Sequence, residues 1–262
     1  KVYLARGLSR RVHLEPAHPE RALTLRGDDT AVLIGDLHIG LEVELEKDGL
    51  RLPSQTAQMA QRVVGLLERT GASRLVILGD LKHTIPFATA REAVDLRRFF
   101  ERISAKVDLV PGNHDAALPP LPDHVTIHPA AGLLLGDVGV GHGHVWPSQE
   151  TMGAREIVTC HNHPSVLLQD ELGHRHKEPA WIRGPFSKTA RVRYPKLPLG
   201  AKFVVMPNFN DLLGGVAFNS LPAEEMLGPL LRNRLFDVER AKVHTLDGID
   251  LGQVGSLRKG KV

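Results

Sequence analysis

Apolar runs and amphipathic stretches alternate along the first half of the chain. The apolar runs cover residues 31–34, 74–78 and 106–110, and the amphipathic stretches cover 53–70 and 88–103. Apolar residues recur at every third or fourth position in both stretches, which predicts two helices packed on a β-α-β-α-β core. The residues expected on the buried faces are Met59, Val63, Leu66 and Leu67 in the first helix, which Gly71 ends, and Val94, Phe99, Phe100 and Ile103 in the second.

After Pro122 the pattern changes to short apolar runs separated by Gly, Pro and His. These runs cover residues 125–127, 133–135, 138–140, 156–159, 166–168 and 202–206. Short strands with tight turns indicate a second, more antiparallel sheet packed on the first. Residues 170–200 are rich in charge, Pro and Gly, and we expect a hairpin tip followed by a long basic excursion. Residues 1–262 are expected to form a single domain.

Polar side chains directly follow five of the apolar runs. They are Asp36 and His38; Asp80 and His83; Asn113, His114 and Asp115; His142 and His144; and His161 and His163. Sites in α/β sheets form at the carboxyl ends of strands, and this mixture of ligands suits Mn, Fe, Co or Zn. A single His is more often a hydrogen-bonded core residue than a ligand. Five strand ends of the same kind favour a metal site.

Two ambiguities among the histidines follow from spacing. His174 and His176 also form a His-x-His string, but they lie in a polar stretch and are interpreted as an exposed hairpin turn. His142 ends an apolar run and is preferred as a ligand over His144. We expect His144 either to support the ligands or to contact substrate.

The order of these strings resembles the calcineurin-like metallophosphoesterases. The strings are Asp-x-His, Gly-Asp-x-x-His, Gly-Asn-His-Asp, a lone His and His-x-His, between residues 36 and 163. Within that superfamily, residues 36–42, 79–83, 142–147, 161–164, 206–210 and 214–215 are similar to the archaeal SbcD-related phosphoesterases and the bacterial PdeM nucleases. The resemblance covers most of the chain.

The resemblance implies an α/β fold, a four-layer α/β/β/α sandwich of two mixed sheets, that holds two divalent metal ions. Asp36, His38 and one later His would hold the first ion, and Asp80 would bridge to the second. The expected ligands are Asp36, His38, Asp80, Asn113, His142, His161 and His163. Mn is the first choice of metal, with Fe, Zn, Co and Ni as alternatives. Cys160 stands where the family has Gly, and we expect a small core residue there rather than a ligand.

Further side chains are assigned to the reaction and to substrate binding. His114, oriented by Asp115, is expected to protonate the leaving oxygen, because an imidazole titrates near neutrality. His83 and Lys82 are expected to contact the phosphate, although Lys82 fits equally well as a solvated surface residue. His144, Arg183 and Lys188 are further candidates for substrate contact.

Composition and charge limit the kinds of site and partner that this chain can have. The single cysteine excludes a disulfide framework and a multi-cysteine zinc site. The net charge is only +3, but basic residues cluster between 183 and 202 and again at 258–261. Such clusters bind nucleic acid or are simply solvated, and no aromatic residues interleave with them. The chain has no run of 18 apolar residues, and Lys1–Arg11 lacks the apolar core of a signal peptide, so we expect a cytoplasmic protein without membrane contact.

Three functions remain open. The first is a nuclease or phosphodiesterase that acts on DNA in repair, for which the resemblance implies helicase or ligase partners. The second is a phosphatase or phosphodiesterase of a small nucleotide, which would use the same metals in a narrower pocket. The third is a non-catalytic metal-binding scaffold. A scaffold would be expected to have lost ligands, whereas every expected position is occupied.

Overall fold

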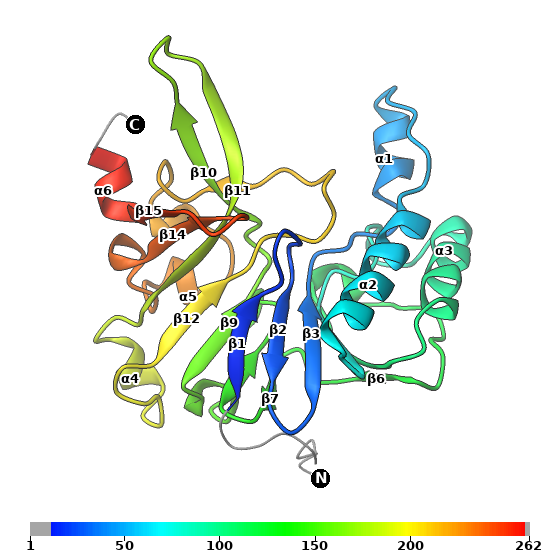
Figure 1. The fold of residues 1–262 in the computed structure, drawn as a ribbon, viewed down its shortest axis with the longest axis horizontal. Coiled ribbons are helices and arrows are strands. Elements are labelled where there is room, and N and C mark those ends of the chain that lie inside the picture. Colours follow the sequence, from blue (N-terminus) through cyan, green and yellow to red (C-terminus); the bar gives the residue numbers. More distant parts are fainter. Residues whose placement is uncertain (1–11, 260–262) are drawn as a thin grey trace.

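Two mixed β-sheets face each other in the computed structural model, which describes residues 12–259 (Figure 1). Lys1–Arg11 and Lys261, which entered the predictions on targeting and charge, lie outside the described residues. The first sheet has the strand order β1-β2-β3-β4-β5-β6, with β3 to β6 parallel. Its strands are β1 (His13–Pro16), β2 (Leu23–Arg26), β3 (Thr30–Ile34), β4 (Arg74–Leu78), β5 (Lys106–Val110) and β6 (Val125–Ile127).

The second sheet has the order β13-β10-β11-β12-β9-β8-β7, and β14 and β15 extend it from β11. Its centre, β8-β9-β12, is parallel, and the pairs around β11 are antiparallel. Its strands are β7 (Leu133–Leu135), β8 (Val138–Val140), β9 (Glu156–Thr159), β10 (Pro164–Gln169), β11 (Arg175–Pro185), β12 (Lys202–Val205), β13 (Val216–Ala217), β14 (Lys242–Thr245) and β15 (Asp250–Gln253).

Helices cover the outer faces of both sheets. The α-helices are α1 (Leu41–Lys47), α2 (Thr56–Thr70), α3 (Ala90–Glu101), α4 (Ala190–Arg193), α5 (Pro229–Arg232) and α6 (Val254–Lys259). The 3₁₀ turns are η1 (Asn113–Asp115), η2 (Thr151–Gly153), η3 (Ala223–Glu225) and η4 (Val238–Arg240). The long α2 and α3 pack on the first sheet, whereas only short helices and loops cover the second.

Alternating side chains of the first sheet separate two apolar layers. On β3, Val32 and Ile34 pack against α2 and α3, and Ala31 and Leu33 face the second sheet. A third apolar cluster lies between the second sheet and the short helices. The predicted α/β/β/α layering with two mixed sheets is therefore confirmed.

The helix predictions are confirmed with one exception. Helix α2 buries the expected residues and ends at Gly71, whose φ is 66°. Helix α3 begins at Thr89, where Thr89 and Glu92 form a capping box. The prediction that Val94 is buried is wrong, because its side chain is 46% exposed, and Leu96 takes that place in the core.

Three details of the sheets also differ from expectation. Strand β6 joins the first sheet parallel to β5, because it directly follows the β5 loop, so the second sheet begins only at β7. Residues 175–185 are not part of a loose excursion but form β11, which pairs with three other strands. The hairpin β1–β2 was not predicted. Among residues 12–259, no helix has the length and apolar character needed to span a membrane.

Candidate metal centre and active site

The carboxyl ends of five strands converge on one site. Strands β3, β4 and β5 are neighbours and parallel, so the loops that carry Asp36, Asp80 and Asn113 leave the sheet side by side. Strands β8 and β9 are parallel neighbours in the second sheet, and they deliver His142 and His161. Because the two sheets face each other, ligands from both meet at the common edge.

The backbone of this site is held in a sparsely populated conformation. Asp36, His38, Asp80, His161 and His163 have φ values of 55°, 44°, 47°, 67° and 42°. Arg234 is the one other non-glycine residue with positive φ in the described part of the chain. Such residues cost about 1 kcal/mol or more each and gather where a function needs a fixed geometry.

Four groups of candidate ligand atoms overlap in this site, and two of them consist only of predicted ligands. One consists of Asp36, His38 and His163, and the other of Asp80, His142 and His161; within each group the ligand atoms lie within 4.8 Å of one another. Asp80 lies between the groups, since its Oδ2 is 3.3 Å from Nε2 of both His38 and His142. This arrangement brings together six of the predicted ligands.

The seventh predicted ligand, Asn113, joins the second group. Its Oδ1 lies 3.2 Å from Nε2 of His142. Two further atoms test whether cations fit: Asp36 Oδ1 and His38 Nε2 are buried and have no hydrogen-bond partner. Both belong to the first group, and a bound cation would satisfy them. The donor set therefore fits two divalent cations that share Asp80.

Charges within the site are strongly coupled. Burial raises the pKa of Asp36 and Asp80, but the imidazole of His163 beside Asp36, and those of His142 and His38 beside Asp80, outweigh it and leave both below the usual range. Burial lowers the pKa of His142, yet Asp80 and Asp36 raise it overall to about 9. Burial and the nearby His142 lower the pKa of His161 to about 3. Without metal, a proton on His142 supplies the positive charge that a bound cation would otherwise supply.

The metal-free protein is therefore expected to be most stable near pH 6.5. His142 has a pKa near 6.5 in the unfolded chain and about 9 in the folded protein. Protonation of His142 therefore stabilises the fold fully below pH 6.5, and this stabilisation, roughly 3 kcal/mol in all, is lost as pH rises to 9. Below pH 6.5 stability falls again, because His161 binds protons more readily when unfolded. Thermal unfolding in EDTA from pH 5 to 9 measures this. A His142→Gln variant should lose the alkaline decline, and a flat profile in the parent would contradict the prediction.

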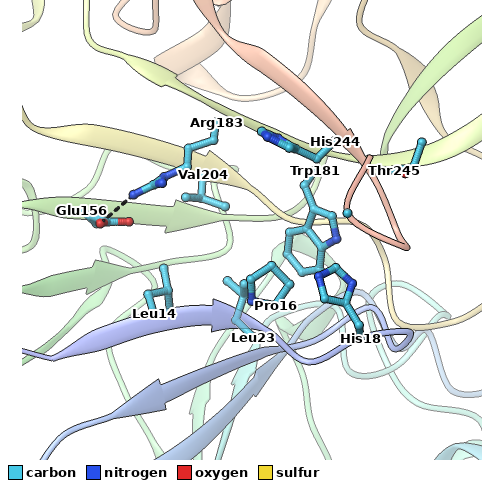
Figure 2. Close-up of a pocket in the computed structure, with 11 residues that line it drawn as sticks. Leu14, Pro16, His18, Leu23, Glu156, Trp181, Arg183, Val204, His244 and Thr245 are labelled. Atoms are coloured by element: carbon cyan, nitrogen blue, oxygen red, sulfur yellow. Dashed lines mark hydrogen bonds and ion pairs between the residues drawn. The ribbon is translucent and has the colours of Figure 1, made fainter. Parts of the chain in front are cut away.

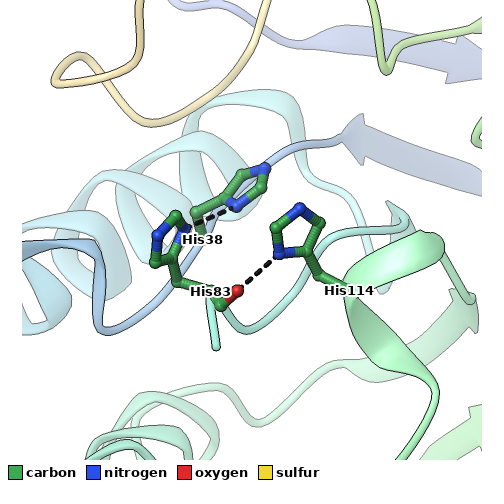
Figure 3. A group of neighbouring side chains, drawn as sticks. All are labelled: His38, His83 and His114. Carbon is green, nitrogen blue, oxygen red and sulfur yellow. Dashed lines mark hydrogen bonds between the residues drawn. The ribbon is translucent and has the colours of Figure 1, made fainter. Parts of the chain in front are cut away.

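Three imidazoles, of which only His38 is a predicted ligand, form a further group at the mouth of the site (Figure 3). Nδ1 of His38 lies 3.1 Å from Nδ1 of His83, and Nε2 of His83 lies 3.1 Å from the carboxylate of Glu44. If Nε2 of His38 holds a cation, its Nδ1–H donates to His83, which in turn donates to Glu44. Both nitrogens of His83 are thus engaged. Instead of the predicted phosphate contact, the structure places His83 where it orients His38.

His114 is oriented differently from the prediction. Its Nδ1 donates to the backbone carbonyl of His83, and its Nε2 is left facing Asp80, 4.0 Å from Oδ2. Asp115 makes no contact with that ring. Its carboxylate accepts the backbone N–H groups of Gly112, at 2.8 Å, and Leu81, at 3.0 Å. Asp115 was expected to orient the imidazole, but it joins the β4 and β5 loops, because burial turns its short side chain toward their free N–H groups.

Comparison with known proteins agrees with this geometry. The family model described as calcineurin-like phosphoesterase matches residues 30–206. The chain belongs to this family. It is accordingly a metal-dependent phosphoester hydrolase. Among curated proteins, no sequence matches that of the chain.

Two solved structures resemble this phosphoesterase. The crystal structure of nuclease MPE from Pseudomonas putida has 19% sequence identity and a TM-score of 0.54, and the match covers 92% of this chain and 100% of that one. YfcE, a phosphoesterase from E. coli, has 19% identity and a TM-score of 0.33 over 85% of this chain and 97% of its own. At these identities the likeness to nuclease MPE concerns the fold.

Lys82 of this phosphoesterase is not a surface residue, so that prediction for it is wrong, and its ammonium is engaged with protein carbonyls rather than free for a phosphate. The side chain is fully buried, and its ammonium donates to the carbonyls of Thr84, Pro86 and His114. Burial lowers the pKa of Lys82, and Asp115 and Glu92 partly offset that effect. The local pattern could not show this, because the three acceptors come from two loops that meet only in the folded protein.

Replacing Lys82 with Met is expected to lower the free energy of unfolding by about 2 to 4 kcal/mol, because three carbonyls lose a charged donor. Urea denaturation measures the loss. Lys47→Met on the exposed face of α1 is the control and should change stability by less than about 0.5 kcal/mol. Equal stability of both variants would show that the ammonium contributes nothing.

Arg183 and Lys188, predicted to bind substrate, lie at the wrong end of the second sheet. Arg183 pairs with Glu156 at 2.9 Å and lines a separate cavity of about 260 Å³ beside Trp181 and β1 (Figure 2). Glu156 begins β9, whereas His161 follows the other end of that strand. Lys188 is exposed after β11, whose last residue pairs with the start of β12. The direction of β11, which the sequence pattern left undetermined, places both basic side chains away from the ligands.

The remaining predictions concern the other histidines and Cys160. His144 lies beside the ligands, with its ring 5.1 Å from that of His142, but belongs to neither ligand group. His174 and His176 are exposed at the β10–β11 hairpin, as predicted. Cys160 is fully buried between the sheets, and burial raises its pKa well above the usual value, so it stays a thiol. It lies 3.3 Å from Nδ1 of His142.

Two supporting residues were missed. Asn210 donates to the carbonyl of Leu37 at 2.8 Å and so holds the loop between Asp36 and His38. Asn162 bonds the backbone of Leu227 through both ends of its amide and so holds the loop between His161 and His163. Each asparagine is buried. Their position inside strings that resemble family motifs could have indicated a role in the site. Their hydrogen-bond partners are distant in sequence, so the role itself could not be predicted.

Proposed function

We propose that this phosphoesterase is a two-metal phosphodiesterase that cleaves DNA. The observation that carries the proposal is the pair of ligand groups joined by Asp80. Two cations held there would activate water and neutralise charge on the attacking and leaving oxygens. Mn²⁺ is the proposed metal, because the donors combine carboxylate, amide and imidazole.

The side chains around the ligands favour a diester. A phosphomonoester carries two negative charges, and binding it favours added ammonium or guanidinium groups. Lys82 is the basic residue nearest in sequence to Asp80, and its ammonium donates to backbone carbonyls. Imidazoles line the mouth instead. They suit a monoanionic diester whose leaving oxygen needs a proton.

His114 is the proposed proton donor to that leaving oxygen. Its Nδ1 is committed to the His83 carbonyl, so Nε2 is the nitrogen free to give up a proton. Glu44 and His83 keep His38 in the tautomer whose Nε2 faces the first ligand group. These assignments give each imidazole at the mouth one task.

DNA as the substrate is supported by the fold likeness to a protein named as a nuclease. The basic stretch at 183–202 no longer supports it, because Arg183 and Lys188 lie away from the ligands. A role in DNA repair with a helicase or ligase partner, and a cytoplasmic location, are proposals carried over from the resemblance of the motifs. Hydrolysis of a small nucleotide diester is the second candidate.

The test compares four substrates in Mn²⁺: single-stranded DNA, a cyclic dinucleotide, bis-p-nitrophenyl phosphate and p-nitrophenyl phosphate. We expect cleavage of DNA and of the bis ester, and at most slow turnover of the monoester. Turnover of the cyclic dinucleotide without DNA cleavage would favour the second candidate. Faster hydrolysis of the monoester than of the bis ester would contradict the assignment as a diesterase.

A further inference from the structure

Phe87 is an exposed aromatic residue on the loop that follows Asp80 and His83. Its side chain is 72% exposed, whereas six of the eight phenylalanines are at most 2% exposed. Ile85, two residues earlier, is 53% exposed. Scattered exposed apolar side chains are ordinary in proteins, so exposure alone means little. The anchoring and the position of this loop are what distinguish it.

The loop that carries Ile85 and Phe87 is held rigidly. Lys82 donates to the carbonyls of Thr84 and Pro86, which flank Ile85. The backbone N–H of Thr84 donates to Glu92 at 2.7 Å, and Phe87 forms a β-bridge with Ala117. A rigid loop loses little entropy when a ligand rests on it. The exposed ring is therefore preorganised.

The same contacts place the loop on the side of the proposed proton donor. The ammonium of Lys82 bonds the carbonyls of Pro86 and His114 together, so the residue before Phe87 and His114 share one donor. The ring of His114 in turn bonds the carbonyl of His83. Phe87 thus lies on the side from which the leaving oxygen receives its proton.

Exposed apolar side chains also lie beside two other ligand loops. Leu227 is 42% exposed, and Asn162, between His161 and His163, bonds its backbone at 2.9 and 3.1 Å. Leu212 is 37% exposed, and its N–H donates to Asn210. Anchored apolar groups are therefore found beside more than one of the loops that carry the ligands.

We propose that Phe87, supported by Ile85, is a stacking platform for the base on the leaving side of the scissile phosphate. Every base has a π face, so an aromatic platform binds an unpaired base with little regard to sequence. A base in a duplex is already stacked and cannot lie on the ring. The platform thus makes an unpaired strand the preferred substrate. This inference rests on the proposed function.

The test measures kcat/KM on a single-stranded oligonucleotide and on a strand of the same length with every base removed. Phe87→Ala should lower kcat/KM on the first by about tenfold or more, and Phe87→Trp should restore it. On the baseless strand Phe87→Ala and the parent should agree within about twofold, which also shows that the metal site is intact. Val192→Ala, which removes an exposed side chain on α4, is the matched control and should change neither rate.

Two failures would be distinguishable. If the parent cleaves DNA and Phe87→Ala loses nothing, or loses equally on both strands, the platform is wrong and the nuclease proposal stands. If the parent cleaves no strand but hydrolyses bis-p-nitrophenyl phosphate, the choice of DNA is wrong, and the platform falls with it.

Discussion

Asp80→Asn is expected to abolish metal loading and phosphoester hydrolysis together. Oδ2 of Asp80 lies 3.3 Å from Nε2 of both His38 and His142, one from each ligand group, whereas Asp36 approaches His142 only at Nδ1, at 3.5 Å. An uncharged amide would leave two imidazoles and two cations without the anion that sets their spacing. Loss of charge stabilisation worth several kcal/mol corresponds to a fall in kcat of roughly a thousandfold or more.

Metal content by mass spectrometry and kcat on bis-p-nitrophenyl phosphate measure the effect. Asp211→Asn is the matched control, because Asp211 is an exposed carboxylate that pairs with Arg62 and Arg21 outside the ligand groups. It should keep both metal and activity. Full metal occupancy in Asp80→Asn would show that Asp80 does not bridge the two metals.

A fold test must accompany this variant, because Asp80 also accepts the backbone N–H of His114 at 2.9 Å. The packing there is tight: a Cβ on Gly112 would lie 2.1 Å from Asp80 Oδ1. An amide oxygen can still accept that hydrogen bond if it takes the place of Oδ1. We therefore expect unchanged far-UV circular dichroism in Asp80→Asn.

His114→Ala is expected to lower kcat by about a hundredfold to ten-thousandfold while both metals stay bound. His114 is grouped with His38 and His83, outside the two groups of predicted ligands, and its Nε2 lies 4.0 Å from Asp80. Removing it takes away a proton donor and leaves the ligands in place. A substrate whose leaving group needs no proton, such as p-nitrophenolate, should be affected much less than DNA.

Comparing DNA with bis-p-nitrophenyl phosphate in this variant separates proton donation from a structural role. Asp115→Asn serves as the structural control. Asp115 bonds the backbone of Gly112 and Leu81, so its substitution should affect the cleavage of both substrates alike. If His114→Ala loses metal as Asp80→Asn does, His114 is a ligand and not a proton donor.

Most of the candidate site followed from position in the sequence. Asp36, Asp80 and Asn113 each come directly after a strand of a parallel sheet, so proximity followed from strand direction alone. Errors arose where side-chain direction mattered. Lys82 was expected beside the phosphate, yet its ammonium points into three carbonyls. Asp115 was expected on His114, yet it binds backbone.

The sequence by itself determined the two helices, the two sheets and the strand ends that meet at the centre, because apolar periodicity and strand ends are local properties of the chain. The four-layer arrangement and the choice of ligands came from the resemblance of its motifs to the family. Only the tertiary structure decided which charges face that centre. Arg183 pairs with Glu156 at the far end of β9, and the ammonium of Lys82 bonds the carbonyl of Pro86 instead of facing the ligands. A side chain takes its direction from partners that folding brings together, and those partners lie far away in the sequence.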